Sequence, residues 1–143
     1  MLDGRGTFAA SRGKRRGMTP IFQAVWVAVV VSVTDGDTVR VRMALWPEVT
    51  IETAVRLRGI DTPELHGHCE RERKLALDAR AALARMLTGQ QVSLSEVTPD
   101  KYGGRVLARV STVNGADVAG DLLKRGLAVS YSGRGPRRNW CAP

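Results

Sequence analysis

The chain has 143 residues, and its 22 Lys and Arg side chains exceed its 14 Asp and Glu side chains, which gives a formal net charge of +8. This length suits one domain with a core of its own and excludes a large α/β enzyme. An apolar content of 43% excludes a chain that is disordered throughout, and 2 cysteines exclude a disulfide scaffold and a four-cysteine zinc site. The excess of positive charge indicates a polyanionic partner, either nucleic acid or an anionic membrane surface.

The start of the chain stands apart in composition, because basic side chains dominate it and large apolar ones are scarce. We interpret residues 1–20 as a basic, disordered N-terminal arm, or as sequence ahead of a later start at Met18. Such an arm either binds phosphates without specificity or is a solvated tail.

An apolar run rich in valine follows at residues 21–33. Its valines favour a buried strand. The run is too short to cross a bilayer as a helix, which takes roughly 20 residues, and an Asp-Gly turn follows it without a cleavage site. We therefore expect no transmembrane span, and the location of the protein stays open between the cytoplasm and export.

Two further strands are predicted after this turn. Apolar residues alternate with others over 38–45, with Leu45 on the apolar side, and again over 49–58, and a Trp-Pro-Glu break separates the two runs. A period of two is typical of half-buried strands. With the valine-rich run before them, these segments predict a meander of three strands.

A helix is predicted over residues 70–87, where apolar side chains recur at helical spacing from Leu75 on and the opposite, charged face includes Glu72. Two more strands are predicted at 91–97 and 105–113, and a short helix at 118–123. This order predicts an α+β fold that is mainly β: a five-stranded OB-type barrel with a helix between strands three and four and a short helix after strand five. Such barrels commonly bind oligonucleotides.

Polar side chains cluster where the predicted strands end. Asp37 opens the second strand, and Asp61 and Glu64 follow the third. Arg56 lies on the third strand opposite its apolar face, and Arg105 leads into the last strand. Each has an ordinary explanation alone, such as a turn or a helix cap. Together, these acids and arginines at one rim of a basic barrel indicate a hard-cation site that receives a phosphodiester.

These residue types suit the hydrolysis of a phosphodiester. Ca²⁺ prefers oxygen ligands, so two aspartates with open coordination leave room for a substrate oxygen. A carboxylate such as Glu64 orients or deprotonates an attacking water, while the cation polarises the phosphoryl group. The guanidinium groups of Arg56 and Arg105 each bind two phosphate oxygens, most strongly in the more negative transition state.

Four ordered motifs extend this pattern over most of the chain. They are VTDGDTVRV at 33–41, VRLRGIDTPE at 55–64, DKYGGRVLARV at 100–110 and LLKRGLAV at 122–129. In order and approximate spacing they resemble the staphylococcal nuclease, or thermonuclease, family. The resemblance implies an OB-fold barrel with packed helices and a Ca²⁺-dependent nuclease, a hydrolase acting on ester bonds. Water would attack at the 5′-side P–O bond and leave 3′-phosphates on DNA or RNA.

The resemblance also implies the roles of individual residues. One Ca²⁺ ion would be bound by Asp37, Asp61 and the backbone carbonyl of Thr62. Glu64 would be the general base. The catalytic, phosphate-binding arginines would be Arg56 and Arg105, so every catalytic side-chain type of the family is present.

Nucleotide contacts are implied for Lys101 and Tyr102, in the loop before the last barrel strand. This loop reads Tyr-Gly-Gly-Arg and has one glycine more than the best-known family member. Downstream of Tyr131 the third helix of the family is missing, and Tyr131 is the residue left for base stacking. We therefore divide the chain into a nuclease domain at 21–132 and a basic C-terminal tail at 133–143.

A further group of candidate ligands, His66, His68 and Cys69, follows Glu64. Zinc would need a fourth donor, and Cys141 is the other cysteine of the chain. A Cys69–Cys141 disulfide that joins the tail to the helix start is the alternative in an exported protein, and free thiols are the alternative in a reducing compartment.

Three functions compete at this stage. The first is the Ca²⁺-dependent nuclease, acting on DNA, RNA or both as a monomer without an obligate protein partner. The second is a non-catalytic, basic OB-fold module that binds single-stranded nucleic acid, which leaves the acidic cluster unexplained because carboxylates repel phosphate. The third is a protein of the membrane surface or envelope, which would use the basic arm and the valine-rich run.

Overall fold

The computed structural model describes residues 24–143. The predicted basic arm at 1–20 and the first residues of the predicted strand at 21–33 lie outside this range. The elements, in chain order, are β1 (Trp26–Asp35), β2 (Thr38–Trp46), β3 (Val49–Leu57), β4 (Ile60–Asp61), α1 (Glu70–Leu87), β5 (Gln91–Pro99), β6 (Arg105–Thr112), α2 (Val118–Lys124) and β7 (Val129–Ser130).

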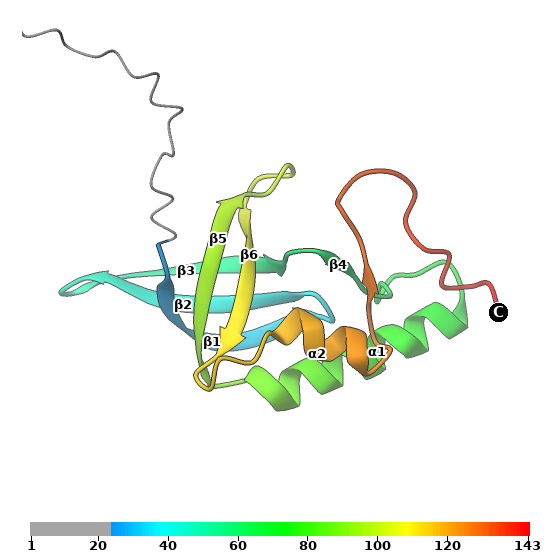
Figure 1. The fold of residues 1–143 in the computed structure, drawn as a ribbon, viewed down its shortest axis with the longest axis horizontal. Helices are drawn as coiled ribbons and strands as arrows, with labels where there is room; N and C mark the ends of the chain where they lie inside the picture. Colours follow the sequence, from blue (N-terminus) through cyan, green and yellow to red (C-terminus); the bar gives the residue numbers. More distant parts are fainter. Residues whose placement is uncertain (1–23) are drawn as a thin grey trace, which may run out of the picture.

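Five strands close into a barrel in the order β1-β2-β3-β6-β5, with β5 pairing back onto β1 (Figure 1). The pairing of β3 with β6 is parallel, and the other barrel pairings are antiparallel. The predicted five-stranded OB-type barrel is therefore confirmed, with α1 between its third and fourth strands and α2 after its fifth. The sequence did not predict β4 and β7, which pair in a separate two-stranded sheet.

The core of the barrel is apolar and fully enclosed, but β1 contributes to it from one face alone. Val30 and Val33 are buried, whereas Val29 and Val31 face solvent. The prediction of a strand buried throughout is therefore wrong for β1. An antiparallel barrel strand has an inner and an outer face, and its valines fill both.

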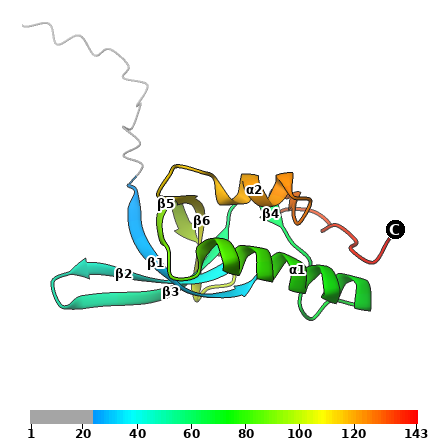
Figure 2. The ribbon, with the colours of Figure 1, turned by 90° about the horizontal axis from the view of Figure 1, so that it is seen from below.

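The two helices lie on the same side of the barrel, where α1 packs on β1 and α2 packs on β6 (Figure 2). Leu83 and Leu87 of α1 are fully buried in the core. The helix ends before Gly89, whose φ of 75° suits glycine and whose N–H donates to Val30 O. Within residues 24–143, neither helix is both long and apolar enough to span a bilayer.

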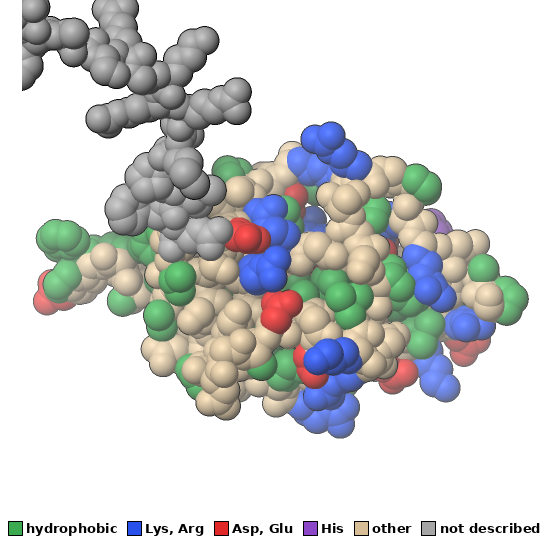
Figure 3. Space-filling view, in the orientation of Figure 1, with side chains coloured by type: hydrophobic (Ala, Val, Ile, Leu, Met, Phe, Trp, Pro, Cys, Tyr) green, Lys and Arg blue, Asp and Glu red, His purple; other side chains and the backbone are tan. Residues whose placement is uncertain are grey.

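The hairpin of β2 and β3 projects beyond the barrel, and its tip is apolar (Figure 3). Trp46 is 73% exposed, and Leu45 and Val49 are exposed beside it. The prediction that Leu45 lies on the buried side of its strand is wrong. The period of two is kept in β2, but the strand runs past the end of the core, so its last residues have no packing partner.

Candidate active site

All the site residues predicted from the sequence line one pocket of about 390 Å³. The β5–β6 loop and the C-terminal segment, which we define as residues 131–143, rise on the same side of the barrel and both contribute to it (Figure 1). Acidic and basic side chains are equally numerous in its lining. The acids are Asp35, Asp37, Asp61, Glu64 and Asp100, and the bases are Arg56, Lys101, Arg105, Arg134 and Arg137.

Arg56 lies between two buried carboxylates. Its Nη2 atom is 3.4 Å from Asp37 Oδ2 and 3.8 Å from Asp61 Oδ1, and it also donates to Ile60 O at 3.1 Å. The strand register explains this geometry, because Arg56 pairs with Thr38, directly after Asp37, while Leu57 N donates to Asp37 O at 2.7 Å. The backbones of β2, β3 and β4 thus hold the Arg56 guanidinium between the two carboxylates.

Burial raises the pKa of Asp37 to about 6. Asp35 adds to this increase through a hydrogen bond and its negative charge, while Arg56 and Thr38 oppose it. The carboxyl group of Asp37 is therefore costly to ionise in the absence of further positive charge. A cation at this position would offset that cost.

Asp61 is the most enclosed acid of the pocket, at 1% exposure, because β4 pairs it with Val129 of β7. Trp140 Nε1 donates to its Oδ2 atom at 3.4 Å. Arg137 donates to its Oδ1 atom through Nη2 at 2.8 Å and Nε at 3.0 Å. These two partners come from the C-terminal segment, so the chain end completes the environment of Asp61.

Arg137 also contacts two other predicted site residues. Its Nη2 atom donates to Thr62 O at 3.3 Å, and its Nη1 atom forms an ion pair with Glu64 Oε1. Burial alone would lower the pKa of Arg137, but hydrogen bonds and charges from Asp61 and Glu64 outweigh it and raise the pKa. The guanidinium group therefore stays protonated. The sequence did not predict Arg137 or Trp140 as site residues, although the tryptophan beside Cys141 was a signal that the end packs back.

Arg105 forms an ion pair with Asp100 where the β5–β6 loop lines the pocket. Burial alone would raise the pKa of Asp100, but the hydrogen bond and charge of Arg105 lower it. The ring of Tyr102 is 75% exposed, with Lys101 Nζ 5.2 Å and the Arg105 guanidinium 5.9 Å from its centroid. These side chains form a cationic, aromatic surface at the pocket mouth. Tyr131 donates its hydroxyl to Gly135 O at 2.9 Å.

The loop that carries Glu64 is held by a residue that the sequence placed on the solvent-facing side of the helix. Glu72 is buried, which corrects that prediction. Its carboxylate accepts from Glu64 N at 3.5 Å and from His68 N at 3.2 Å. A Cβ atom at Gly67 would lie 2.5 Å from the same carboxylate, so glycine is required for the close approach.

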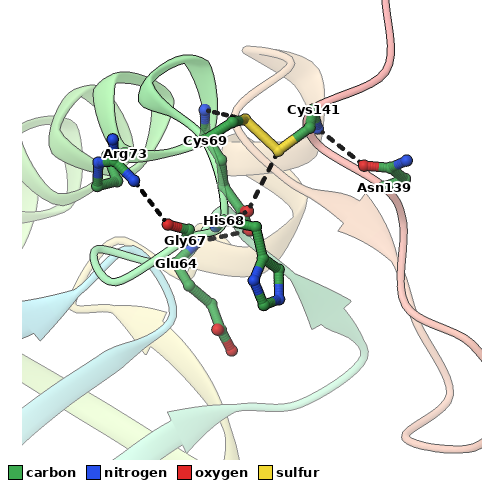
Figure 4. Close-up of a disulfide and its surroundings, with 8 residues drawn as sticks. Glu64, Gly67, His68, Cys69, Arg73, Asn139 and Cys141 are labelled. Atoms are coloured by element: carbon green, nitrogen blue, oxygen red, sulfur yellow. Dashed lines mark hydrogen bonds between the residues drawn. A yellow bond between two sulfur atoms is a disulfide. The ribbon is translucent and has the colours of Figure 1, made fainter.

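Cys69 and Cys141 form a disulfide that joins the start of α1 to the C-terminal segment (Figure 4). Of the three alternatives for these cysteines, the structure therefore contains the disulfide. A zinc site at His66, His68 and Cys69 would lack a thiolate ligand, because the sulfur of Cys69 is bonded to that of Cys141. Cys69 also caps α1, since its sulfur accepts from Glu72 N at 3.4 Å.

The donors predicted to bind a cation are all oxygen atoms: the carboxylates of Asp37 and Asp61 and the carbonyl of Thr62. Each of these residues is buried, and the guanidinium of Arg137 already lies against two of them. Buried carboxylates need an opposite charge, and oxygen ligands are those that Ca²⁺ prefers. The residues present therefore fit a hard divalent cation.

Fold and site together define an OB-type barrel with a pocket of carboxylates and arginines at its rim. Residues 54–140 match the family model described as staphylococcal nuclease homologue. This match spans more than half of the chain, so the chain belongs to that family. The resemblance that the four sequence motifs indicated is confirmed.

The curated proteins that the chain resembles include three that are named as endonucleases or probable endonucleases. The chain is 32% identical to the probable endonuclease lcl3 of Neosartorya fischeri, over 73% of the chain and 44% of the relative. The probable endonuclease lcl3 of Penicillium rubens gives 32% identity over 73% and 45%. Endonuclease Htp3 of Saprolegnia parasitica gives 32% over 71% and 54%. The chain spans about half the length of the curated relatives it matches.

Proposed function

We propose that the protein is a Ca²⁺-dependent nuclease that hydrolyses phosphodiester bonds of DNA or RNA, as a monomer. The observation that carries this proposal is the pocket that brings Asp37, Asp61 and Glu64 together with Arg56 and Arg105. Membership of the staphylococcal nuclease family and relatives named endonucleases support it.

The cation would be held by Asp37, Asp61 and the carbonyl of Thr62. When bound, it would polarise a phosphoryl oxygen and neutralise charge that develops there. The protein prepares this position by burying both carboxylates beside Arg56. Burial raises the pKa of Asp37 to about 6, so a cation bound beside its carboxylate would favour the ionised form.

Glu64 would be the general base. Its side chain is 54% exposed, so water reaches it, while Glu72 holds the backbone of its loop. The carboxylate takes a proton from a water molecule as the water oxygen attacks phosphorus. The bond from phosphorus to the 5′ oxygen breaks, this oxygen is protonated from solvent, and a 3′-phosphate remains.

Arg56 and Arg105 would bind the phosphate oxygens. Both guanidinium groups lie in the pocket, and each is oriented by a carboxylate, Asp37 for Arg56 and Asp100 for Arg105. A guanidinium has several N–H donors, so pairing with a carboxylate leaves donors for phosphate. These bonds strengthen as the phosphate gains charge in the transition state.

Tyr102, Lys101 and Tyr131 would contact the nucleotide. The exposed ring of Tyr102 offers a stacking surface at the pocket mouth, and stacking on an aromatic side chain contributes about 1–3 kcal/mol per base. Lys101 Nζ lies 5.2 Å from that ring and supplies charge next to it. Together they would bind the strand that enters the pocket.

The test compares Glu64→Gln with a matched control, Glu52→Gln. Glu52 lies on β3 outside the pocket, where it pairs with Arg40. Removing the general base lowers kcat on single-stranded DNA by about 10²–10⁴-fold, whereas the control variant cleaves as the wild type does. If Glu64→Gln cleaves as fast as the wild type, the assigned base is wrong.

A further inference from the structure

We propose that Arg137 is a third active-site arginine, which binds the phosphate of the substrate, and that the Cys69–Cys141 disulfide positions it. This inference rests on the proposed nuclease function. Nothing in the sequence motifs of the family pointed to Arg137, which lies beyond the last of them.

The guanidinium of Arg137 lies among the proposed catalytic groups. It lies inside the pocket and forms hydrogen bonds with Asp61, Thr62 O and Glu64. Two of these groups are proposed cation ligands, and Glu64 is the proposed base. An arginine in contact with all three lies beside the groups that would contact the reacting phosphate.

Contacts on both sides of Arg137 hold the segment that carries it in place. Trp140, three residues after Arg137, is buried and donates to Asp61 Oδ2. Cys141 is bonded to Cys69 at the start of α1. On the other side, Tyr131 N donates to Gly59 O at 3.0 Å, so the segment that carries Arg137 is anchored at both ends.

The neighbouring Arg138 provides a contrast within the same segment. Its guanidinium lies 4.9 Å from the centroid of the Trp140 ring, outside the pocket lining. The two consecutive arginines therefore point to different surroundings. Arg137 faces the acids of the site, and Arg138 covers the tryptophan that anchors the segment.

The charge of the pocket also favours a role for Arg137 in binding an anion. Its acidic and basic side chains are equal in number, so the pocket alone does not attract an anion. A divalent cation at Asp61 and Thr62 O would compete with the guanidinium for the same oxygen atoms. Arg137 would then be free to bind an anion, and its anchored segment keeps it inside the pocket. Its planar group matches two phosphate oxygens.

The disulfide is the covalent part of this anchor. It connects residues 72 positions apart, and its loss would leave the segment beyond Tyr131 held by noncovalent contacts alone, among them the hydrogen bonds of Arg137 and the packing of the buried Trp140. The Cys69–Cys141 bond would thus act on the substrate through Arg137. In this sense the two cysteines are positioning residues.

The test measures kcat and KM on single-stranded DNA and, separately, Ca²⁺ binding by titration calorimetry. Arg137→Gln lowers kcat/KM by about 10- to 100-fold, the loss expected for a hydrogen-bonded charge, and Arg137→Lys recovers part of it. Arg109→Gln is the control and leaves kcat/KM unchanged, because Arg109 lies outside the pocket and pairs with Glu96. Ca²⁺ binds Arg137→Gln at least as tightly as the wild type, because a competitor for Asp61 has been removed.

A double-mutant cycle tests the role of the disulfide. Cys69→Ser with Cys141→Ser lowers kcat/KM as Arg137→Gln does, and adding Arg137→Gln to the two serines causes no further loss. Serine at position 69 keeps a helix cap, so a folded variant is expected. Independent, additive losses would overturn the positioning role.

Three other results would decide against the inference. If Arg137→Gln cleaves as fast as the wild type or faster, Arg137 only competes with the cation. If it loses Ca²⁺ affinity together with activity, Arg137 is a structural support. If the wild type itself cleaves neither DNA nor RNA in Ca²⁺, the proposed function fails, and the inference fails with it.

Discussion

The two walls of the pocket are built in different ways. Arg56 belongs to the barrel strand β3, and Asp37 lies in the tight turn between β1 and β2, where the flanking backbone ladders fix its position. Arg137 and Trp140 belong to a segment without regular secondary structure, which side-chain contacts and one disulfide hold in place. We call Asp37 and Arg56 the strand wall, and Arg137 and Trp140 the segment wall. The strand wall keeps its geometry as long as the barrel is folded, whereas the segment wall depends on a few long-range bonds.

The largest expected effect on activity comes from a substitution in the strand wall. Arg56→Gln removes the positive charge between Asp37 and Asp61 and one phosphate ligand, so we expect kcat/KM to fall by about 10²–10³-fold. Arg40→Gln is the control, because Arg40 lies exposed on the neighbouring strand and pairs with Glu52. Steady-state kinetics on DNA measure both, and equal rates would remove Arg56 from the site.

The next effect concerns stability and the segment wall. Replacing Cys69 and Cys141 by serine lowers the free energy of unfolding by about 2–5 kcal/mol, because a cross-link over 72 positions restricts the unfolded chain. Urea denaturation with and without reductant measures this loss. An unchanged midpoint would show that the segment does not need the bond.

The pH dependence of the free energy of unfolding tests the burial of Asp37 in the strand wall. Its pKa rises from 3.8 unfolded to about 6 folded, so the stability linked to its protonated form is present below pH 4 and is lost as the pH rises through 6. In Ca²⁺-free buffer, Asp37→Asn should therefore gain about 2–2.5 kcal/mol relative to the wild type between pH 4 and pH 8. A pH-independent difference in the free energy of unfolding would contradict the raised pKa.

The smallest effect concerns Trp140. Trp140→Phe keeps an aromatic ring in the buried position but loses the hydrogen bond from Nε1 to Asp61. We expect a loss of about 1 kcal/mol in the free energy of unfolding. Thermal unfolding measures it, and a loss above 3 kcal/mol would mean that the ring packing differs from the one described.

The strand wall could be predicted from sequence because its determinants are local. A period of two places Arg56 opposite the apolar face, and turns bring Asp37 and Asp61 to the ends of neighbouring strands. The two-residue strands β4 and β7 are too short to leave any periodicity. Their pairing, which buries Asp61, joins segments that lie far apart in the sequence.

The segment wall could not be predicted, because its determinants are contacts between distant residues. Arg137 meets Asp61 across 76 positions, and no local pattern distinguishes it from the neighbouring Arg138. Glu72 was assigned to the solvent side because its charge favours water, whereas in the structure it accepts N–H groups of the loop after Glu64. The exposed tip at Trp46 likewise depends on where the core ends.

The most direct test of the central claim is the incubation of the wild-type protein with single-stranded DNA in Ca²⁺ buffer and, in parallel, with EGTA. A Ca²⁺-dependent nuclease degrades the DNA in the first sample and leaves it intact in the second, and the products carry 3′-phosphates. Intact DNA in both samples, shifted on a native gel by bound protein, would contradict the account and identify a binding module.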